Sequence, residues 1–162
     1  GRISKIGAWD VAQVCAGVWV QFPRKCGSVG GEGFTNCGKA AITVKGAITV
    51  LGSYSFSNSG ITAITLGEGI TSIPDNCFYG SSLRSITLPS SVTSVGSAAF
   101  RNCTRLTGVT VNSVVTLRSS AFSECSALTN DSLHFSSGGS FAFAEGVGGG
   151  TATLGSAFYR IG

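Results

Sequence analysis

The chain has 162 residues, of which 43% are apolar and 11% charged, so it is long enough and apolar enough for a folded domain with a sizeable core, which excludes a disordered chain. The net charge of +4 comes from scattered residues without a run of Lys or Arg, which argues against a nucleic acid partner. No apolar run reaches the about 18 residues that a membrane-spanning helix needs. The 24 glycines, together with Ser and Thr between short apolar runs, favour strands and turns over helices.

The chain contains an internal repeat of 22 residues, marked by Phe34, Phe56, Phe78, Phe100 and Phe122. Taken in chain order, residues 42–44, 64–66, 86–88 and 109–111 place one polar residue between two apolar ones, the pattern of a short half-buried strand. A second apolar pair follows in each copy: Ile48 and Leu51, Ile70 and Ile73, Val92 and Val95, Val114 and Leu117. We therefore expect each copy to form one coil of a repeat protein.

Weaker copies extend the repeat in both directions. Residues 3–11 and 20–22 match the coil upstream, and residues 153–158 match it downstream. Residues 136–151, rich in Gly and Ser, break the spacing as a loop, an insertion or a degenerate coil. The sequence thus predicts a single solenoid over residues 1–162, with about seven coils.

A single coil has too few apolar residues to bury a core by itself, so it has to pack against its neighbours. Coils stacked at the strand spacing of about 4.8 Å would form parallel ladders and place each Phe on the next inside the stack. The predicted fold class is a repeat solenoid, built mainly from short parallel β-strands and turns with little regular helix.

Three copies carry the motif Leu-x-x-Ile-x-Leu or a close variant, at residues 61–66, 83–88 and 106–111, which resembles the core of the leucine-rich repeat. The continuation over residues 88–103, Leu-Pro-Ser-Ser-Val-Thr-Ser-Val-Gly followed by Ala-Phe-x-x-Cys, resembles the BspA-like subclass found on surface and secreted proteins of bacteria and some protists. The resemblance implies a leucine-rich-repeat solenoid with a ligand-facing parallel sheet, in an extracellular or cell-surface location.

The polar residues between the apolar strand residues are expected to point outward as a ladder. The expected binding face is made of Trp19, Gln21, Thr43, Thr65, Ser85, Thr87 and Thr110, accompanied by Ala41, Ala63 and Gly108. Thr suits a strand for its own sake, and cross-strand Thr pairs stabilise it. A regular Thr array also resembles ice-binding surfaces, but these usually have paired Thr columns, and here the companion column is Ala, Ser or Gly.

Four cysteines, Cys15, Cys37, Cys103 and Cys125, occupy one repeat position, which Ser59 and Ser81 fill in the coils between them. A position that accepts Cys or Ser is typical of a tight buried turn, so packing is the favoured role. Cys15 with Cys37, and Cys103 with Cys125, would be one coil apart, where a disulfide is also conceivable. No Cys-x-x-Cys pair is present, which argues against a zinc or redox centre.

The residues predict neither an enzyme nor a cofactor or metal site. His134 is the single histidine, and the seven acidic residues stand at different repeat positions, so no pair is arranged for acid-base catalysis. No nucleophile elbow, phosphate loop or metalloprotease motif occurs.

Both ends of the sequence interrupt a coil without a visible polar cap, so we expect either a piece of a longer protein or ends that stack on other copies. The residues expected at such assembly ends are Ile3, Ile6, Phe158 and Tyr159. Two hypotheses follow. The first is a non-catalytic interaction module for adhesion, whose partner is a protein or glycan on another cell or matrix. The second is a structural subunit that binds copies of itself in an extracellular filament.

Overall fold

The computed structural model describes residues 5–6, 28–29, 47–48 and 50–144. They contain twelve short strands, one 3-10 helix (η1, Asn130–Ser132) and no α-helix. The strands are β1 (Lys5–Ile6), β2 (Ser28–Val29), β3 (Ala47–Ile48), β4 (Val50–Leu51), β5 (Thr65–Leu66), β6 (Ser72–Ile73), β7 (Ser85–Leu88), β8 (Ser94–Val95), β9 (Gly108–Val111), β10 (Val114–Leu117), β11 (Leu133–Phe135) and β12 (Ser140–Phe143).

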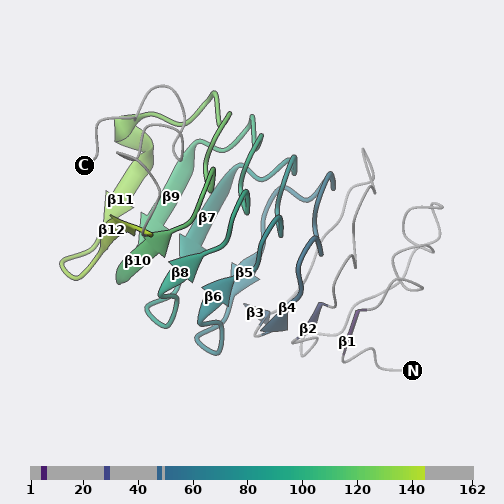
Figure 1. The fold of residues 1–162 in the computed structure, drawn as a ribbon, viewed down its shortest axis with the longest axis horizontal. Coiled ribbons are helices and arrows are strands. Elements are labelled where there is room, and N and C mark those ends of the chain that lie inside the picture. The colour runs from purple at the N-terminus through teal and green to yellow at the C-terminus, as the bar shows by residue number, and fades with distance from the viewer. Residues whose placement is uncertain (1–4, 7–27, 30–46, 49, 145–162) are drawn as a thin grey trace.

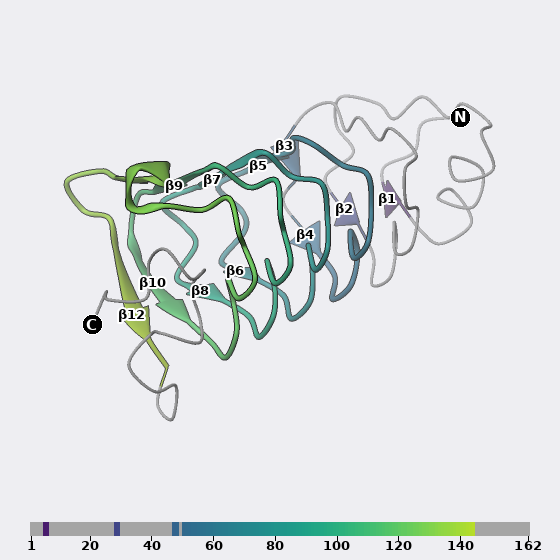
Figure 2. The same ribbon diagram turned by 90° about the horizontal axis from the view of Figure 1, so that it is seen from above.

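Every strand pair is parallel, and the chain winds as a solenoid whose coils lie side by side (Figure 1). The first side of the coils carries β3, β5, β7, β9 and β11, and the second side carries β1, β2, β4, β6, β8, β10 and β12 (Figure 2). The strands expected at residues 64–66, 86–88 and 109–111 are confirmed as β5, β7 and β9. The predicted solenoid of short parallel strands is therefore the observed fold.

The core is a column of phenylalanine rings that runs through the stack. Phe56, Phe78, Phe100 and Phe122 are completely buried. Successive rings are nearly parallel, with centroids 5.4, 5.2 and 5.0 Å apart. This is the arrangement that the 22-residue spacing predicted; Phe34 lies outside the described residues. The inward strand residues of each coil, such as Ile86 and Leu88, pack around this column.

The segment around each phenylalanine, the Phe turn, forms a third ladder although it is not a strand. The N–H groups of Phe56, Phe78 and Phe100 donate to carbonyls of the following coil at 2.7–2.8 Å. The residues two before and two after each Phe have positive φ, which any residue other than Gly adopts only at an energetic cost: Tyr54, Asn58, Asn76, Gly80, Ala98, Asn102, Ser120 and Glu124. Bonds to the next coil offset that cost.

The Phe-turn ladder has a direction. Its donors belong to the earlier coil and its acceptors to the later coil, as in Asn76 N–H to Ser97 O at 2.9 Å. In the last described Phe turn the N–H groups of Ser120, Phe122 and Glu124 occupy the donor positions, and they have no acceptor among the described residues. Among the described residues the ladder therefore finishes with donors on the side toward the C-terminus, which we call the donor end.

Three details differ from the sequence expectation. Ile48 pairs with Leu66 on the first side, although the repeat had placed it in the column of Ile70 and Val92. Val114 is 58% exposed, because β10 is four residues long and its alternation turns Val115 inward instead. Residues 140–143, expected within the broken repeat, form strand β12 in register with β10.

Candidate functional site

The first side of the solenoid presents a row of small polar side chains, as the sequence predicted. Residues alternate outward and inward along β7, so Ser85 and Thr87 are exposed while Ile86 and Leu88 are buried. The register places Ser85 opposite Gly108 and Thr87 opposite Thr110, and Thr110 is half-buried. We call Thr65, Ser85, Thr87, Gly108, Thr110 and His134 the outer strand face.

His134 is a member of this face that the sequence analysis did not include. It lies on β11 directly opposite Thr110, and its side chain is exposed. The signal was available, because Leu133-His134-Phe135 repeats the alternation of Val109-Thr110-Val111. The outward column that carries hydroxyl groups at Thr87 and Thr110 therefore carries an imidazole at β11.

The repeat predicted Thr43 for the position opposite Thr65 on the neighbouring strand. The strand residue opposite Thr65 is Ala47, four positions further along the chain. Thr43 itself, like Trp19 and Gln21, lies outside the described residues. On the described part of the face, the residues brought together are Ser85, Thr87 and Thr110, with Thr65 on the preceding strand.

The margins of the outer strand face are held by hydrogen bonds between coils. At one margin the Thr107 hydroxyl donates to Arg84 O at 3.2 Å. At the other, Asn112 donates to Leu88 O at 3.1 Å, and the Glu68 carboxylate accepts from the Ser90 hydroxyl at 3.0 Å. Because both margins are fixed to the neighbouring coil, the face is a preorganised surface, which lowers the entropy cost of binding.

Gly108 leaves the centre of the face open. A Cβ built on it would lie 3.6 Å from Ser85 Cβ, which is an ordinary van der Waals contact. A side chain would fit there without moving the backbone. A flat partner can thus approach the backbone of β9 at this point, and a larger residue would obstruct it.

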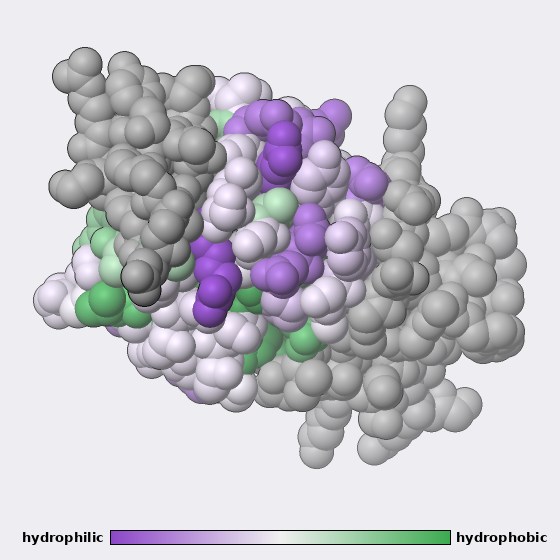
Figure 3. Space-filling view, viewed as in Figure 1, coloured by the Kyte–Doolittle hydropathy of each residue, from purple (hydrophilic) through white to green (hydrophobic). Residues whose placement is uncertain are grey.

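The coloured, described part of the surface in Figure 3 is mostly polar to neutral, with small apolar areas. The second side has an outward row of its own, in which Ser72, Ser94 and Thr116 lie opposite one another. Because the first and second sides are separate sheets, the two polar rows belong to different surfaces.

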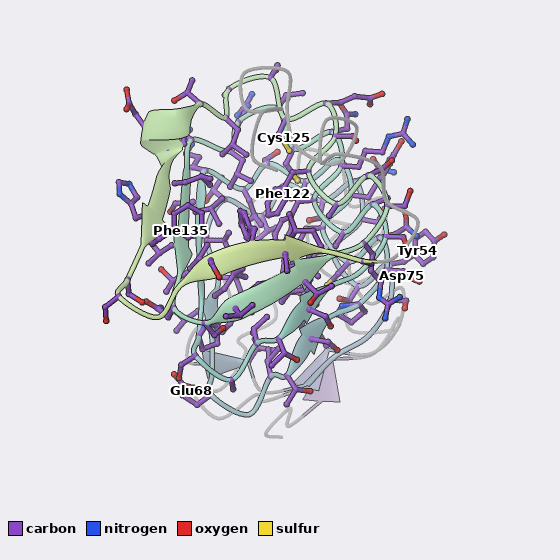
Figure 4. All side chains as sticks on the ribbon, turned by 60° about the vertical axis from the view of Figure 1, so that its left-hand side comes forward. Tyr54, Glu68, Asp75, Phe122, Cys125 and Phe135 are labelled. Carbon is purple, nitrogen blue, oxygen red and sulfur yellow. The ribbon has the colours of Figure 1, made fainter. Side chains whose placement is uncertain are left out.

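Figure 4 shows where the labelled residues lie on the coils: Phe135 is on β11, Glu68 is at a corner, and Tyr54 and Asp75 project from the Phe turns.

The predicted cysteine column is present for its described members. Cys103 and Cys125 are completely buried thiols, and each donates to the backbone carbonyl of the phenylalanine in the preceding coil, at 3.0 Å. Ser81 continues the column, with its hydroxyl 3.5 Å from Cys103 Sγ. Cys15 and Cys37 lie outside the described residues. The described members are buried in the core, and the packing role of this position stays a prediction.

Cys77 occupies a different column, immediately before Phe78, where later coils have Ala99 and Ala121. Its Sγ lies 3.3 Å from the Ser55 hydroxyl, and burial raises its pKa to about 12. It is a buried neutral thiol. Within the described part of the chain, no group of three His, Cys, Asp or Glu side chains lies close enough together to hold a metal ion.

Of the residues expected at assembly ends, only Ile6 is described, and it pairs with Val29 on the second side. Ile3, Phe158 and Tyr159 fall outside the described ranges. Toward the C-terminus of the stack, the inward residues of the last strands are incompletely covered. Phe135 is 42% exposed, and its ring meets that of Phe141 edge-on, with the ring centroids 5.3 Å apart. Among the described residues there is no helix long and apolar enough to span a bilayer.

A family model described as "BspA type Leucine rich repeat region" matches six copies over residues 13–145. The chain belongs to this family. The resemblance seen in residues 61–66, 83–88 and 106–111 is thereby confirmed, and the solenoid described above is a BspA-type leucine-rich repeat. The match extends on both sides of the described strands β2 to β12.

A solved structure similar to this BspA-type chain is the crystal structure of a leucine-rich cell surface protein from Faecalibacterium prausnitzii A2-165. The two are 18% identical, with a TM-score of 0.47, and the match covers 68% of this chain and 45% of that chain. A comparison with curated proteins gave no match.

Proposed function

We propose that this BspA-type solenoid is a non-catalytic interaction module on the cell surface or outside the cell, and that its outer strand face binds a protein or glycan in adhesion. The observation that carries the proposal is the in-register row of the exposed Ser85 and Thr87 and the half-buried Thr110 around the open position Gly108. Hydroxyls repeat at about 4.8 Å across the strands and about 6.6 Å along them, which suits a flat, hydrogen-bonding partner.

Two further observations support this proposal. The similar leucine-rich protein of Faecalibacterium prausnitzii is described as a cell surface protein, which agrees with the location that the family resemblance implies. Apart from His134, the outer strand face is also composed of small residues, Ser, Thr and Gly, that lose little rotamer entropy on binding. A surface that is already ordered by hydrogen bonds to its neighbours spends less free energy on association.

The test is a binding measurement with fibronectin, collagen and mucin immobilised on a sensor surface. Gly108→Arg places a long side chain in the centre of the outer strand face, and Ser72→Arg places the same side chain on the exposed second side as a matched control. We expect Gly108→Arg to abolish binding while Ser72→Arg retains it, with equal melting temperatures. Equal loss in both variants, or full binding by Gly108→Arg, would exclude the outer strand face.

A second candidate function is head-to-tail assembly into a filament, which would use the donor end of the stack. Two observations favour it: the N–H groups of Ser120, Phe122 and Glu124 have no acceptor among the described residues, and Phe135, on strand β11 at the same end of the stack, is 42% exposed. A coil of a second copy would supply carbonyls and apolar surface together. Such a contact joins unlike surfaces and therefore propagates.

Sedimentation velocity over a range of concentrations, with electron microscopy of the same samples, tests this second candidate. Phe135→Lys charges the donor end, whereas Tyr54→Lys charges an equally exposed aromatic residue on a Phe turn in an earlier coil. Assembly requires that filaments shorten with Phe135→Lys and persist with Tyr54→Lys. Monomers at every concentration for the unaltered chain would rule it out, and would leave the binding module.

A further inference from the structure

Cys103 and Cys125 have equivalent positions in two successive coils. Each lies three residues after a ring of the phenylalanine column, and the rings of Phe100 and Phe122 are 5.0 Å apart and within 3° of parallel. The backbones between them are joined by the bond from Asn102 N–H to Ser123 O at 2.8 Å. The two cysteines are thus held in register at the separation of neighbouring strands.

Their side chains also share one orientation. Cys103 Sγ donates to Phe78 O and Cys125 Sγ donates to Phe100 O, both at 3.0 Å, so each thiol points toward the preceding coil. Figure 4 shows Cys125 in the interior beside Phe122. A hydrogen bond with Cys103, and after it burial, raise the pKa of the Cys125 thiol. One coil earlier in the same column, Ser81 Oγ lies 3.5 Å from Cys103 Sγ. The equivalent step from Cys103 to Cys125 makes their sulfur atoms neighbours in the stack.

We propose that Cys103 and Cys125 are an oxidative cross-linking site, at which a disulfide joins the two coils. Neighbouring hydrogen-bonded coils lie about 4.8 Å apart, within the range of about 4.4–6.8 Å between Cα atoms that a disulfide requires. The oxidant is a low-molecular-weight disulfide of the glutathione class. Such a cross-link persists in the oxidising surroundings of an extracellular protein.

The reaction is two successive thiol-disulfide exchanges. One cysteine, as its thiolate, attacks a sulfur of the small disulfide; that S–S bond breaks, and the small thiolate that leaves takes up a proton. The second cysteine, after losing its proton, attacks the protein-bound sulfur of the mixed disulfide and expels the second small thiol. The protein loses two hydrogen atoms and two electrons, and the small disulfide is reduced to two thiols.

Access restricts when this exchange occurs. Both thiols are completely buried in the closed stack, so the small disulfide reaches them while the coils assemble or when they open locally. Cys77 provides an internal contrast, because its sulfur meets the Ser55 hydroxyl and its column continues with Ala99 and Ala121. The described part of the chain therefore contains one pair of stacked thiols and one thiol without a stacked cysteine.

The full chain is refolded in a mixture of reduced and oxidised glutathione, remaining thiols are blocked with N-ethylmaleimide under denaturing conditions, and tryptic peptides are analysed by mass spectrometry. Cleavage after Arg101, Arg105, Arg118 and Arg160 isolates Cys103 in residues 102–105 and Cys125 in residues 119–160, while Cys77 falls in residues 46–84. We expect residues 102–105 linked to residues 119–160. Recovery of residues 102–105 as the alkylated peptide, or linked to another peptide, would overturn the proposal.

A stability measurement supplies an independent readout. Cys103→Ser removes the cross-link with a residue that Ser81 and Ser59 already place in this column, so the fold tolerates it. Dithiothreitol should lower the melting temperature of the refolded wild type by several degrees, because the loop of one coil is released in the unfolded chain. Cys103→Ser has no such cross-link to reduce, so dithiothreitol should lower its melting temperature by several degrees less than that of the wild type. Cys77→Ala should show the same decrease as the wild type. An equal drop in wild type and Cys103→Ser would overturn the cross-link.

Discussion

The ring of Phe100 lies 5.2 Å from that of Phe78 on one side and 5.0 Å from that of Phe122 on the other. It is completely buried, and its neighbours are rings in rigid turns that cannot collapse into a gap. Phe100→Ala should therefore lower the free energy of unfolding by about 3–5 kcal/mol. Urea unfolding followed by circular dichroism measures this, with Phe135→Ala as the control that removes a half-exposed ring. Similar losses for the two variants would show that the column is not the main source of stability.

The phenylalanine column and the outward row could both be predicted from the sequence, because each depends on a period. A spacing of 22 residues brings Phe56, Phe78, Phe100 and Phe122 onto one line only if the chain forms coils of that length. Alternation then decides which strand residues face the core, so Ser85 and Thr87 had to point outward once Ile86 and Leu88 pointed inward. The fold and most of the candidate face follow from these two patterns.

Where the pattern is ambiguous, prediction failed for a physical reason. The sequence Ala-Ile-Thr-Val occurs at residues 41–44 and again at 47–50, so two registers satisfy the same strand alternation. The structure pairs the second copy, through Ala47 and Ile48, with β5. Val114 and Val115 present a similar difficulty, since either can face inward; alternation within β10 puts Val115 on the same inward side as Leu117. The direction of the Phe-turn ladder has no signal in residue type at all.

Gly96 is a position where a single methyl group should be costly. A Cβ there would lie 2.6 Å from the backbone N of Asp75 and 2.8 Å from the carbonyl carbon of Pro74, and backbone atoms cannot move aside. We expect Gly96→Ala to lower the free energy of unfolding by about 1–3 kcal/mol. Gly108→Ala is the matched control, since its nearest neighbour is 3.6 Å away. Chemical denaturation of both variants checks the difference, and equal effects would contradict the close approach of the coils at Gly96.

Ser59 is the member of the cysteine column whose removal should stabilise the protein. Its hydroxyl is buried and has no hydrogen-bond partner among the described residues, whereas the equivalent Ser81 hydroxyl lies 3.5 Å from Cys103 Sγ. Because an unsatisfied buried polar group carries a desolvation cost, Ser59→Ala should raise the free energy of unfolding by about 1 kcal/mol. Ser81→Ala should give no such gain. The two variants are compared by urea unfolding at neutral pH, where a loss of stability in Ser59→Ala would disprove the interpretation.

Cys77 should make the stability depend on pH in the alkaline range. Burial, opposed by the hydrogen bond with Ser55, raises the pKa of this thiol from 9.0 to about 12 in the folded protein. Above pH 9 the unfolded chain gives up the proton while the folded chain keeps it, so the unfolded state binds fewer protons and stability falls as the pH rises. Its contribution is fully present below pH 9 and declines between pH 9 and 12, by about 1.4 kcal/mol per pH unit at most.

The measurement is the free energy of unfolding in urea at pH 8, 9, 10 and 11, for the wild type and for Cys77→Ala, each in the presence of a reductant. Ala is the residue that the same column carries at positions 99 and 121, so the variant keeps the core arrangement. The wild type should lose stability more steeply than Cys77→Ala above pH 9, while the two curves run parallel below it. Parallel curves up to pH 11 would mean that the thiol ionises equally in both states, and hence that Cys77 is reached by water in the folded protein.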